Sequence, residues 1–215
     1  MASSEEYSAI EISALRQQEL LPMLDALDSL DLARFSYVSI HAPSRIDPTW
    51  EAIAWDALRD QLPRNFPIVV HPDALYDMSL WRQFGSLVCV ENMDKRKPIG
   101  RTAKELDRIF SQLPEASLCF DIGHARQCDP TMTEAYLILR EFGSRLRQVH
   151  VSEVSTESKH NRLSFTSVLS FRDVAHLIPE DVPLILETPV SATEMAEEVR
   201  RVRDALPIAL QTMVA

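Results

Sequence analysis

Side chains that can bind a metal ion end six of the seven short apolar runs in this sequence. An ionisable group at the end of a buried strand is costly unless it meets a partner, a metal ion or solvent. One such residue is ordinary, because strands usually lead into polar loops, but six among seven runs indicate a shared purpose. The six residues are His41, His71, Glu91, Asp121, His150 and Glu187.

Three imidazoles and three carboxylates suit Zn²⁺, Mn²⁺ or Fe²⁺ better than Ca²⁺. A catalytic zinc ion takes about three protein ligands, so six ligands exceed what one ion needs. The set therefore predicts divalent metal ions as the cofactor, most simply two ions that share a bridging carboxylate.

The apolar runs have the length and near-continuous apolarity of buried parallel strands. The stretches between them carry apolar residues at helical spacing, such as the leucines of 15–30. Strand and helix alternate without a hairpin signal, which predicts βα units and a parallel sheet. The expected strands are 9–13, 37–41, 67–71, 87–91, 117–121, 146–150 and 184–187, and the clearest expected helices are 15–30, 102–113, 131–142 and 191–206.

The ligand pattern favours a closed sheet over an open one. In a parallel barrel all strands end at one rim, where active sites lie, so ligands far apart in sequence become neighbours. We therefore predict an α/β fold, a (β/α) TIM barrel that forms a single domain over residues 1–215. Seven runs are one short of eight. The apolar tail 208–214 would supply the eighth strand by a permuted route, and the alternatives are a frayed tail and an incomplete barrel.

Composition narrows the class of protein. No apolar run approaches the ~18 residues of a membrane helix, and residues 1–8 lack the features of a secretory signal, so we expect a cytoplasmic protein. Three cysteines without metal-binding spacing are expected to be reduced, with Cys89 and Cys119 in the core. Only four glycines are present, which excludes a glycine-rich phosphate loop.

The net charge of −10 argues against a broad, non-specific nucleic-acid binder. It leaves room for a small anionic substrate, because metal ions and local basic loops can reverse the field at one site. The alternative for these loops is ordinary solvation, since acidic residues share them. The basic loop residues are Arg45, Lys95, Arg96, Lys97, Arg101, Arg126, Lys159 and Arg162, of which Lys95, Arg126, Lys159 and Arg162 are the candidates for contact with an anion.

Two further histidines lie in the expected loops. His124 follows Asp121 in the segment DIGH, and His160 lies ten residues after His150. Either is a candidate for a third metal or for substrate contact, against the alternatives of a supporting hydrogen bond for His124 and a solvated loop residue for His160. His176 falls within a helical stretch and is expected to be structural.

Six motifs in order resemble the xylose isomerase-like superfamily, which includes endonuclease IV and sugar isomerases and epimerases. FDIGHA and LILET are the most specific of them. The superfamily has a (β/α)₈ barrel with divalent metals at the C-terminal rim, so the resemblance implies the same here. The motifs are IHAPS (40–44), VVHPD (69–73), VENMD (90–94), FDIGHA (120–125), VHVSE (149–153) and LILETP (184–189).

The resemblance to endonuclease IV implies that the carboxylate of Glu91 bridges two metal ions. His41 and His71 would bind one ion, and the second would take Glu91 together with Asp121, His150 and Glu187. His124 would bind a third ion, but the aspartate that this family adds is absent from 158–160, which reads SKH. The loops are also shorter than the DNA-gripping loops of that family, so nucleic acid is not the favoured substrate.

The isomerase and epimerase branch implies a different use of the same residues. It binds one metal at positions matching Glu91, Asp121, His150 and Glu187, its two glutamates move substrate protons, and His124 would bind substrate. The leading interpretation is a dinuclear phosphoester hydrolase, with catalytic Glu91 and Glu187. The alternatives are a sugar or sugar-phosphate isomerase or epimerase, another metal chemistry at the same site, and a non-catalytic barrel that binds a partner. The sequence leaves the oligomeric state open.

Overall fold

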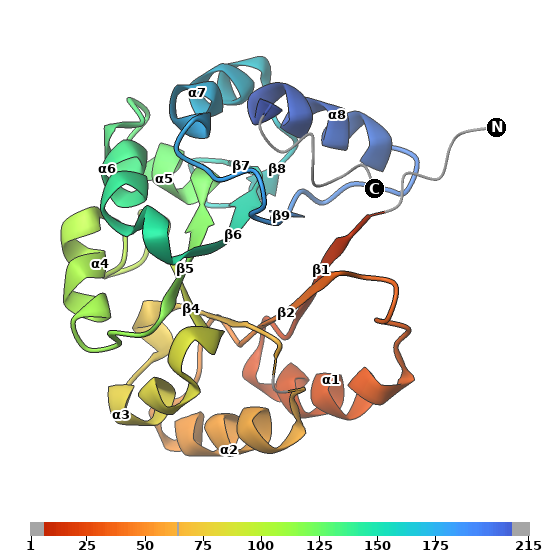
Figure 1. Cartoon of the computed structure of the whole chain (residues 1–215), viewed down its shortest axis with the longest axis vertical. Helices are drawn as coiled ribbons and strands as arrows, with labels where there is room; N and C mark the ends of the chain where they lie inside the picture. The colour runs from red at the N-terminus through yellow and green to blue at the C-terminus, as the bar shows by residue number, and fades with distance from the viewer. Residues whose placement is uncertain (1–6, 64, 208–215) are drawn as a thin grey trace.

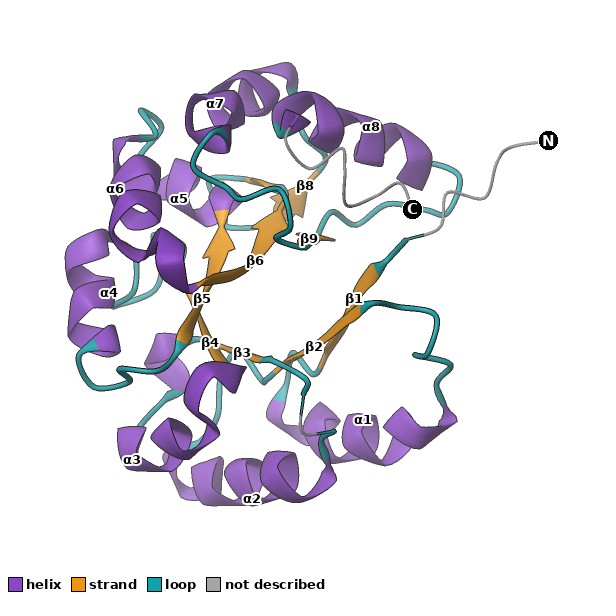
Figure 2. Ribbon diagram, viewed as in Figure 1, coloured by secondary structure: helices purple, strands orange, loops and turns teal. Residues whose placement is uncertain are grey.

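Seven parallel strands form one curved sheet that almost closes into a barrel, in the order β1-β2-β3-β4-β5-β6-β9. The computed structural model describes residues 7–63 and 65–207. Figure 2 shows the strands as an inner ring. The predicted runs all form strands, with ends that differ by a residue or two. The strands are β1 (Ala9–Ser13), β2 (Tyr37–His41), β3 (Ile68–Val70), β4 (Val88–Glu91), β5 (Ser117–Asp121), β6 (Leu146–Val151) and β9 (Leu184–Leu186).

Helices surround the sheet on its outer side (Figure 1). The main apolar core lies between these helices and the sheet and includes the fully buried Trp81, Phe120 and Phe171. No helix among the described residues is long and apolar enough to cross a membrane. The α-helices are α1 (Leu20–Ala26), α2 (Glu51–Gln61), α3 (Met78–Trp81), α4 (Ala103–Phe110), α5 (Ile122–Cys128), α6 (Thr133–Phe142), α7 (Phe165–Ala175) and α8 (Met195–Ala205), and short 3₁₀ segments are η1 (Gln17–Glu19), η2 (Leu27–Ser29), η3 (Pro48–Trp50), η4 (Pro72–Ala74), η5 (Arg82–Leu87) and η6 (Gly143–Arg145).

The expected helix over 15–30 is shorter in the structure. Its α-helical part is α1, flanked by the 3₁₀ segments η1 and η2. Pro22 explains the late start, because proline is tolerated only in the first turn of an α-helix, where its missing N–H is not needed. His176 was expected within a helix, and it lies just past α7 as the C-cap residue.

A small antiparallel hairpin was not expected from the sequence. Strands β7 (Glu153–Val154) and β8 (His160–Asn161) pair after β6. The turn between them contains no glycine. Ser158 adopts a positive φ of 54°, and the Ser155 hydroxyl accepts hydrogen bonds from the backbone N–H groups of Glu157 and Lys159. The hairpin turns His160 back toward the sheet instead of leaving it in a solvated loop.

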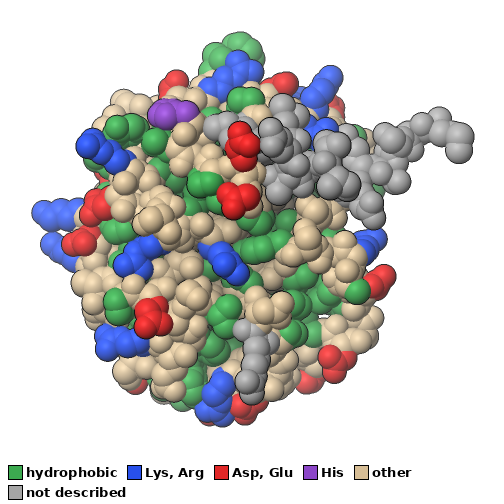
Figure 3. Space-filling model, viewed as in Figure 1, with side chains coloured by type: hydrophobic (Ala, Val, Ile, Leu, Met, Phe, Trp, Pro, Cys, Tyr) green, Lys and Arg blue, Asp and Glu red, His purple; other side chains and the backbone are tan. Residues whose placement is uncertain are grey.

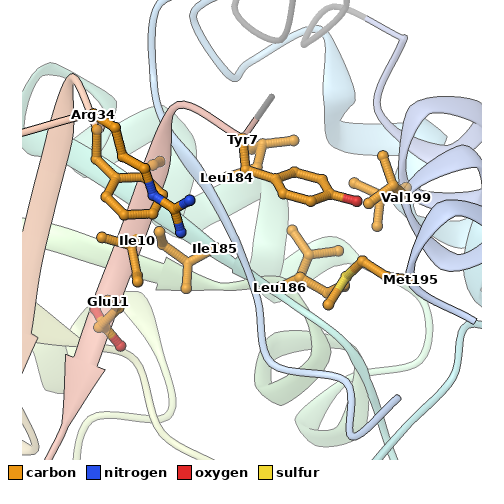
Figure 4. A pocket seen from close by; sticks show the side chains of 13 residues that line it. Tyr7, Ile10, Glu11, Arg34, Leu184, Ile185, Leu186, Met195 and Val199 are labelled. Carbon is orange, nitrogen blue, oxygen red and sulfur yellow. The ribbon is translucent and has the colours of Figure 1, made fainter. Parts of the chain in front are cut away.

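The barrel is incomplete between β1 and β9, which do not pair in the described part of the chain. A cavity of about 640 Å³ lies at this seam. Its walls come from β1, β9 and α8, and Figure 4 shows Tyr7, Met195 and Val199 among the apolar residues around it. The predicted eighth strand, 208–214, lies outside the described residues.

The barrel interior is built in layers whose members lie two residues apart on each strand. Below the rim residues lie small or polar side chains, including the buried free thiols Cys89 and Cys119, which pack with Val69. This fits the expectation that both cysteines are reduced core residues. Barrel interiors of this type are usually filled by bulky branched side chains. The filling here instead includes hydrogen-bonding groups beneath the rim, such as Ser39 and Gln148.

Gly123 allows α5 to begin close to the hairpin. A Cβ atom at this position would collide with the backbone oxygen of Ser152 and lie 2.8 Å from Val154 Cγ2. We expect Gly123→Ala to lower the free energy of unfolding by about 1–3 kcal/mol, as overpacking does. The control is Gly143→Ala, because a Cβ there meets nothing within 4 Å and φ is −57°. Urea denaturation measures both, and equal stability of the two variants would contradict the prediction.

Candidate metal centre

The carboxylate of Glu91 lies at the centre of a cluster of buried histidines. Its Oε2 atom lies 3.2 Å from His41 Nε2 and 3.1 Å from His71 Nε2. Its Oε1 atom lies 3.1 Å from His124 Nδ1 and 3.8 Å from His150 Nδ1. Each oxygen thus faces its own pair of imidazoles, which is the arrangement of a carboxylate that can bridge two ions.

The first pair of histidines comes from neighbouring strands, as predicted. His41 ends β2, and His71 follows β3 directly, so parallel pairing brings the two rings to a centroid distance of 5.1 Å. His41 Nδ1 donates a hydrogen bond of 2.7 Å to the carbonyl of Ala42. In a neutral ring this leaves the lone pair on Nε2, the atom that faces Glu91, so His41 is oriented as a metal ligand is.

The second half of the cluster comes from β5, β6 and β9, the strands beyond β4 in the sheet order. Ligand atoms of Glu91, Asp121 and His150 all lie within 4.8 Å of one another. Asn92 fixes the end of β5 through two hydrogen bonds of 2.8 Å, one to the Asp121 carbonyl and one from its N–H. Glu187 follows β9 and brings its Oε1 to 3.3 Å from His150 Nδ1. The structure therefore brings all six strand-terminal residues together.

His124 and His160 lie beside this cluster. His124 Nδ1 is 3.0 Å from the carbonyl of Asn92, to which it can donate. His160, on β8, places Nδ1 2.7 Å from the Ser152 hydroxyl and 3.5 Å from Glu187 Oε2. Ligand atoms of Asp121, His160 and Glu187 also fall within 4.8 Å of one another. A role of either histidine in a third metal site or in substrate contact stays a prediction.

The residues present fit divalent metal ions. Four buried polar atoms in the cluster lack a hydrogen-bonding partner: His71 Nδ1, His150 Nδ1, Asp121 Oδ2 and Glu187 Oε2. The last three of these atoms each have a charged or imidazole group of a neighbouring side chain at 3.3–3.5 Å, but the geometry is not that of a hydrogen bond. Buried polar groups are normally satisfied, and leaving them unpaired costs free energy. Mixed nitrogen and carboxylate donors are those that zinc, manganese and iron accept.

The cluster strongly perturbs the protonation of its members. Burial opposes charge on His41, but the hydrogen bond to Glu91 and the charge of Glu11 outweigh it and raise the His41 pKa to about 9. Burial lowers the pKa of His71, with a further contribution from His41. Burial among other carboxylates raises the pKa of Glu187 to about 8. A cation bound in the cluster would oppose this shift, because its charge favours the ionised carboxylate.

The basic residues predicted to meet an anion are differently placed. Arg162 forms ion pairs with Glu194, Glu197 and Glu198, and Arg126 lies 3.9 Å from Glu153. Lys95 and Lys159 are exposed and form no side-chain ion pair within the described ranges. The anion-binding role of all four stays a prediction, and the two lysines are the better placed to bind one.

Histidine side chains are nearly absent from the molecular face shown in Figure 3, where charged groups of both signs are scattered. This agrees with the burial of the cluster, in which His150 is fully buried and His41 is 3% exposed. The cluster reaches solvent mainly through His160 and Glu187, whose side chains are 33% and 21% exposed.

Sequence reasoning missed the residues that support the ligands. Asn92 stands one position after Glu91, just past the end of β4. Glu11 lies in the middle of β1, and Gln148 lies two residues before His150. A charged residue inside an apolar run was the available signal for Glu11, but attention to strand ends alone passed over it.

The chain matches no family profile and no curated protein sequence. Among solved structures it is similar to the crystal structure of a xylose isomerase domain protein from Planctomyces limnophilus. The TM-score is 0.56 at 11% sequence identity, covering 96% of this chain and 88% of that chain. A likeness at this identity shows the fold, and it confirms the prediction from the motifs: the chain has an incomplete TIM barrel of the xylose isomerase-like type.

Proposed function

We propose that this protein is a dinuclear divalent-metal enzyme that hydrolyses phosphoesters. The proposal rests on the different neighbours of the two Glu91 oxygens. Oε2 faces His41 and His71, and Oε1 faces His124 and His150. A single ion does not require ligands on both sides of one carboxylate.

The predicted ligands fall into two groups, one for each ion, and Glu91 belongs to both. His41, His71 and Glu91 would hold one ion, and Glu91, Asp121, His150 and Glu187 would hold the other. Paired metal ions about 3.5–4 Å apart supply a hydroxide nucleophile and stabilise the leaving oxygen of a phosphoester.

The protein groups would also meet the substrate. Glu187, with a side chain 21% exposed, is the most accessible of the six predicted ligands, so it would contact a bound substrate as well as the second ion. Lys95 and Lys159 would attract the anionic substrate to the rim.

A second candidate is a sugar or sugar-phosphate isomerase or epimerase. The observation that favours it is a pair of carboxylates beside His150, with Glu187 Oε1 at 3.3 Å and Glu91 Oε1 at 3.8 Å from Nδ1, because such enzymes move a substrate proton with positioned side chains. Both carboxylates lie within 3.8 Å of the same nitrogen, so both could exchange a proton with one substrate. This reaction would need only the second metal position.

Metal content distinguishes the two candidates. We expect about two zinc or manganese ions per chain, and the His41→Ala, His71→Ala double variant should lose about one ion while remaining folded, because three ligands define a catalytic metal position. His176→Ala is the matched control, since His176 caps α7 away from the cluster. Elemental analysis measures the ions. Unchanged metal content in the double variant would favour the mononuclear isomerase.

Catalysis itself should depend on Glu187. With a panel of phosphomonoesters and phosphodiesters, Glu187→Gln should lower kcat by about 10²–10⁴-fold, because it removes a carboxylate that would hold the second ion and so weakens its several kcal/mol of charge stabilisation. Sugars and sugar phosphates assayed for isomerisation are the parallel panel. Turnover of the second panel in the absence of any phosphoester cleavage would refute the hydrolase proposal.

The exposed lysines should act on substrate capture. We expect the Lys95→Ala, Lys159→Ala variant to raise KM for an anionic substrate by about three- to tenfold, less at high salt, with kcat little changed. Lys104→Ala removes a positive charge from the exposed side of α4 and serves as control. An unchanged KM in the double variant would show that these lysines do not meet the substrate.

A further inference from the structure

Glu11 places a buried negative charge inside the barrel, one layer below the metal ligands. Its Oε2 atom accepts hydrogen bonds from Gln148 Nε2 at 2.7 Å and from Ser39 Oγ at 2.9 Å. Its Oε1 atom lies 3.1 Å from His150 Nε2. Three side chains that can donate hydrogen bonds thus surround this one carboxylate, which favours its ionised form.

The two nitrogens of His150 face different neighbours. Nδ1 faces the metal cluster, 3.3 Å from Glu187 Oε1 and 3.8 Å from Glu91 Oε1, and it has no hydrogen-bonding partner. Nε2 faces Glu11. A neutral imidazole carries a proton on one nitrogen and a lone pair on the other. Metal binding through Nδ1 therefore requires the proton to be on Nε2.

Two groups compete for His150 Nε2. Gln148 Nε2 lies 2.7 Å away and, as a donor, would favour the lone pair there, which is the wrong tautomer for a metal at Nδ1. Glu11, as an acceptor, favours the proton. The Gln148 amide already donates to Glu11 and accepts from the Tyr37 hydroxyl at 2.7 Å. Hydrogen bonds to an ionised acceptor are about twice as strong as neutral ones, so Glu11 prevails.

We propose that Glu11 is a positioning residue that holds His150 with its proton on Nε2, so that Nδ1 presents its lone pair to the metal. The proposal rests on the metal centre of the proposed function, but not on which reaction the centre performs. Ligating histidines commonly donate their second N–H to a carboxylate, which orients the ring and increases its basicity.

Glu11 is better placed to support a ligand than to be one. Ligand atoms of Glu11, His41 and Glu187 do fall within 4.8 Å of one another. Both oxygens of Glu11 are nevertheless already engaged by His150, Gln148 and Ser39. The residue also lies two positions before the end of β1, whereas each predicted ligand stands within one residue of a strand end.

The contact also connects two strands that are not neighbours. β1 is one edge of the sheet, and β6 lies five strands away in its order, next to β9. Figure 4 shows Glu11 at the margin of the seam cavity, apart from the apolar side chains around it. The Glu11–His150 pair therefore crosses the barrel beside the open seam and fixes His150 relative to β1.

The test compares zinc affinity in wild-type protein and Glu11→Gln, an isosteric change that removes the charge. Competition with a chromophoric chelator should show binding about 10–100-fold weaker in the variant, the usual effect of losing such a partner. Ser39→Ala is the matched control, because it removes another hydrogen bond to the same carboxylate without touching His150. It should bind zinc as the wild-type protein does.

A second measurement needs no variant. In zinc-loaded wild-type protein, ¹⁵N NMR should show the His150 proton on Nε2 and the metal on Nδ1. The opposite assignment, or equal affinity in wild type and Glu11→Gln, overturns the role of Glu11 and leaves the metal enzyme standing. Failure of the wild-type protein to bind zinc, manganese or iron overturns both.

Discussion

A single buried carboxylate, that of Glu91, sets the conditions for the rest of the centre. Removing a charge from water costs several kcal/mol even after relaxation, and only well-placed partners offset the cost. Glu91 is 1% exposed and lies within 3.8 Å of four imidazoles. These imidazoles come from β2, the residue after β3, α5 and β6, so the partners meet only when the sheet has curled around β4.

The position of β4 explains how one side chain can join two groups of ligands. It is the central strand of the seven, with β1 to β3 on one side and β5, β6 and β9 on the other. His41 and His71 approach from the first side, and Asp121, His150 and Glu187 approach from the second. A carboxylate has two oxygens, and its place on the middle strand points one of them to each half of the barrel.

Much of this arrangement could be predicted because parallel strands share a direction. Six residues that end apolar runs must meet at one rim if the sheet curls, and no knowledge of side-chain packing is needed. Glu11 could not be found in that way, since its meaning depends on Gln148 and His150, more than 130 residues along the chain. The partner of a loop arginine could not be predicted from the sequence either. Arg162 reads as an anion contact in sequence, yet the packing of α8 surrounds it with three glutamates.

The hairpin and the shortened first helix show a second kind of limit. Ser158 adopts a left-handed conformation without glycine or asparagine, so composition gave no turn signal before β8. The helix over 15–30 was predicted from its leucines, but the constraint of Pro22 on the backbone prevailed over apolar periodicity. In both places local backbone chemistry decided the structure, while the prediction relied on the pattern of apolar side chains.

Because the barrel is incomplete, hydrogen bonds between polar side chains in its interior help to hold the sheet in its curved shape. Edge strands have hydrogen-bonding partners on one side only, and in the described chain β1 pairs with β2 alone. Apolar packing inside the ring is slight, because Ser39, Cys89 and Cys119 occupy positions where barrels usually place branched side chains. The hydrogen bonds that Glu11 accepts from Gln148 and His150 thus hold the first strand to the far half of the sheet. The same bonds orient His150, a candidate metal ligand, so the geometry of the cluster and the curvature of the sheet depend on each other.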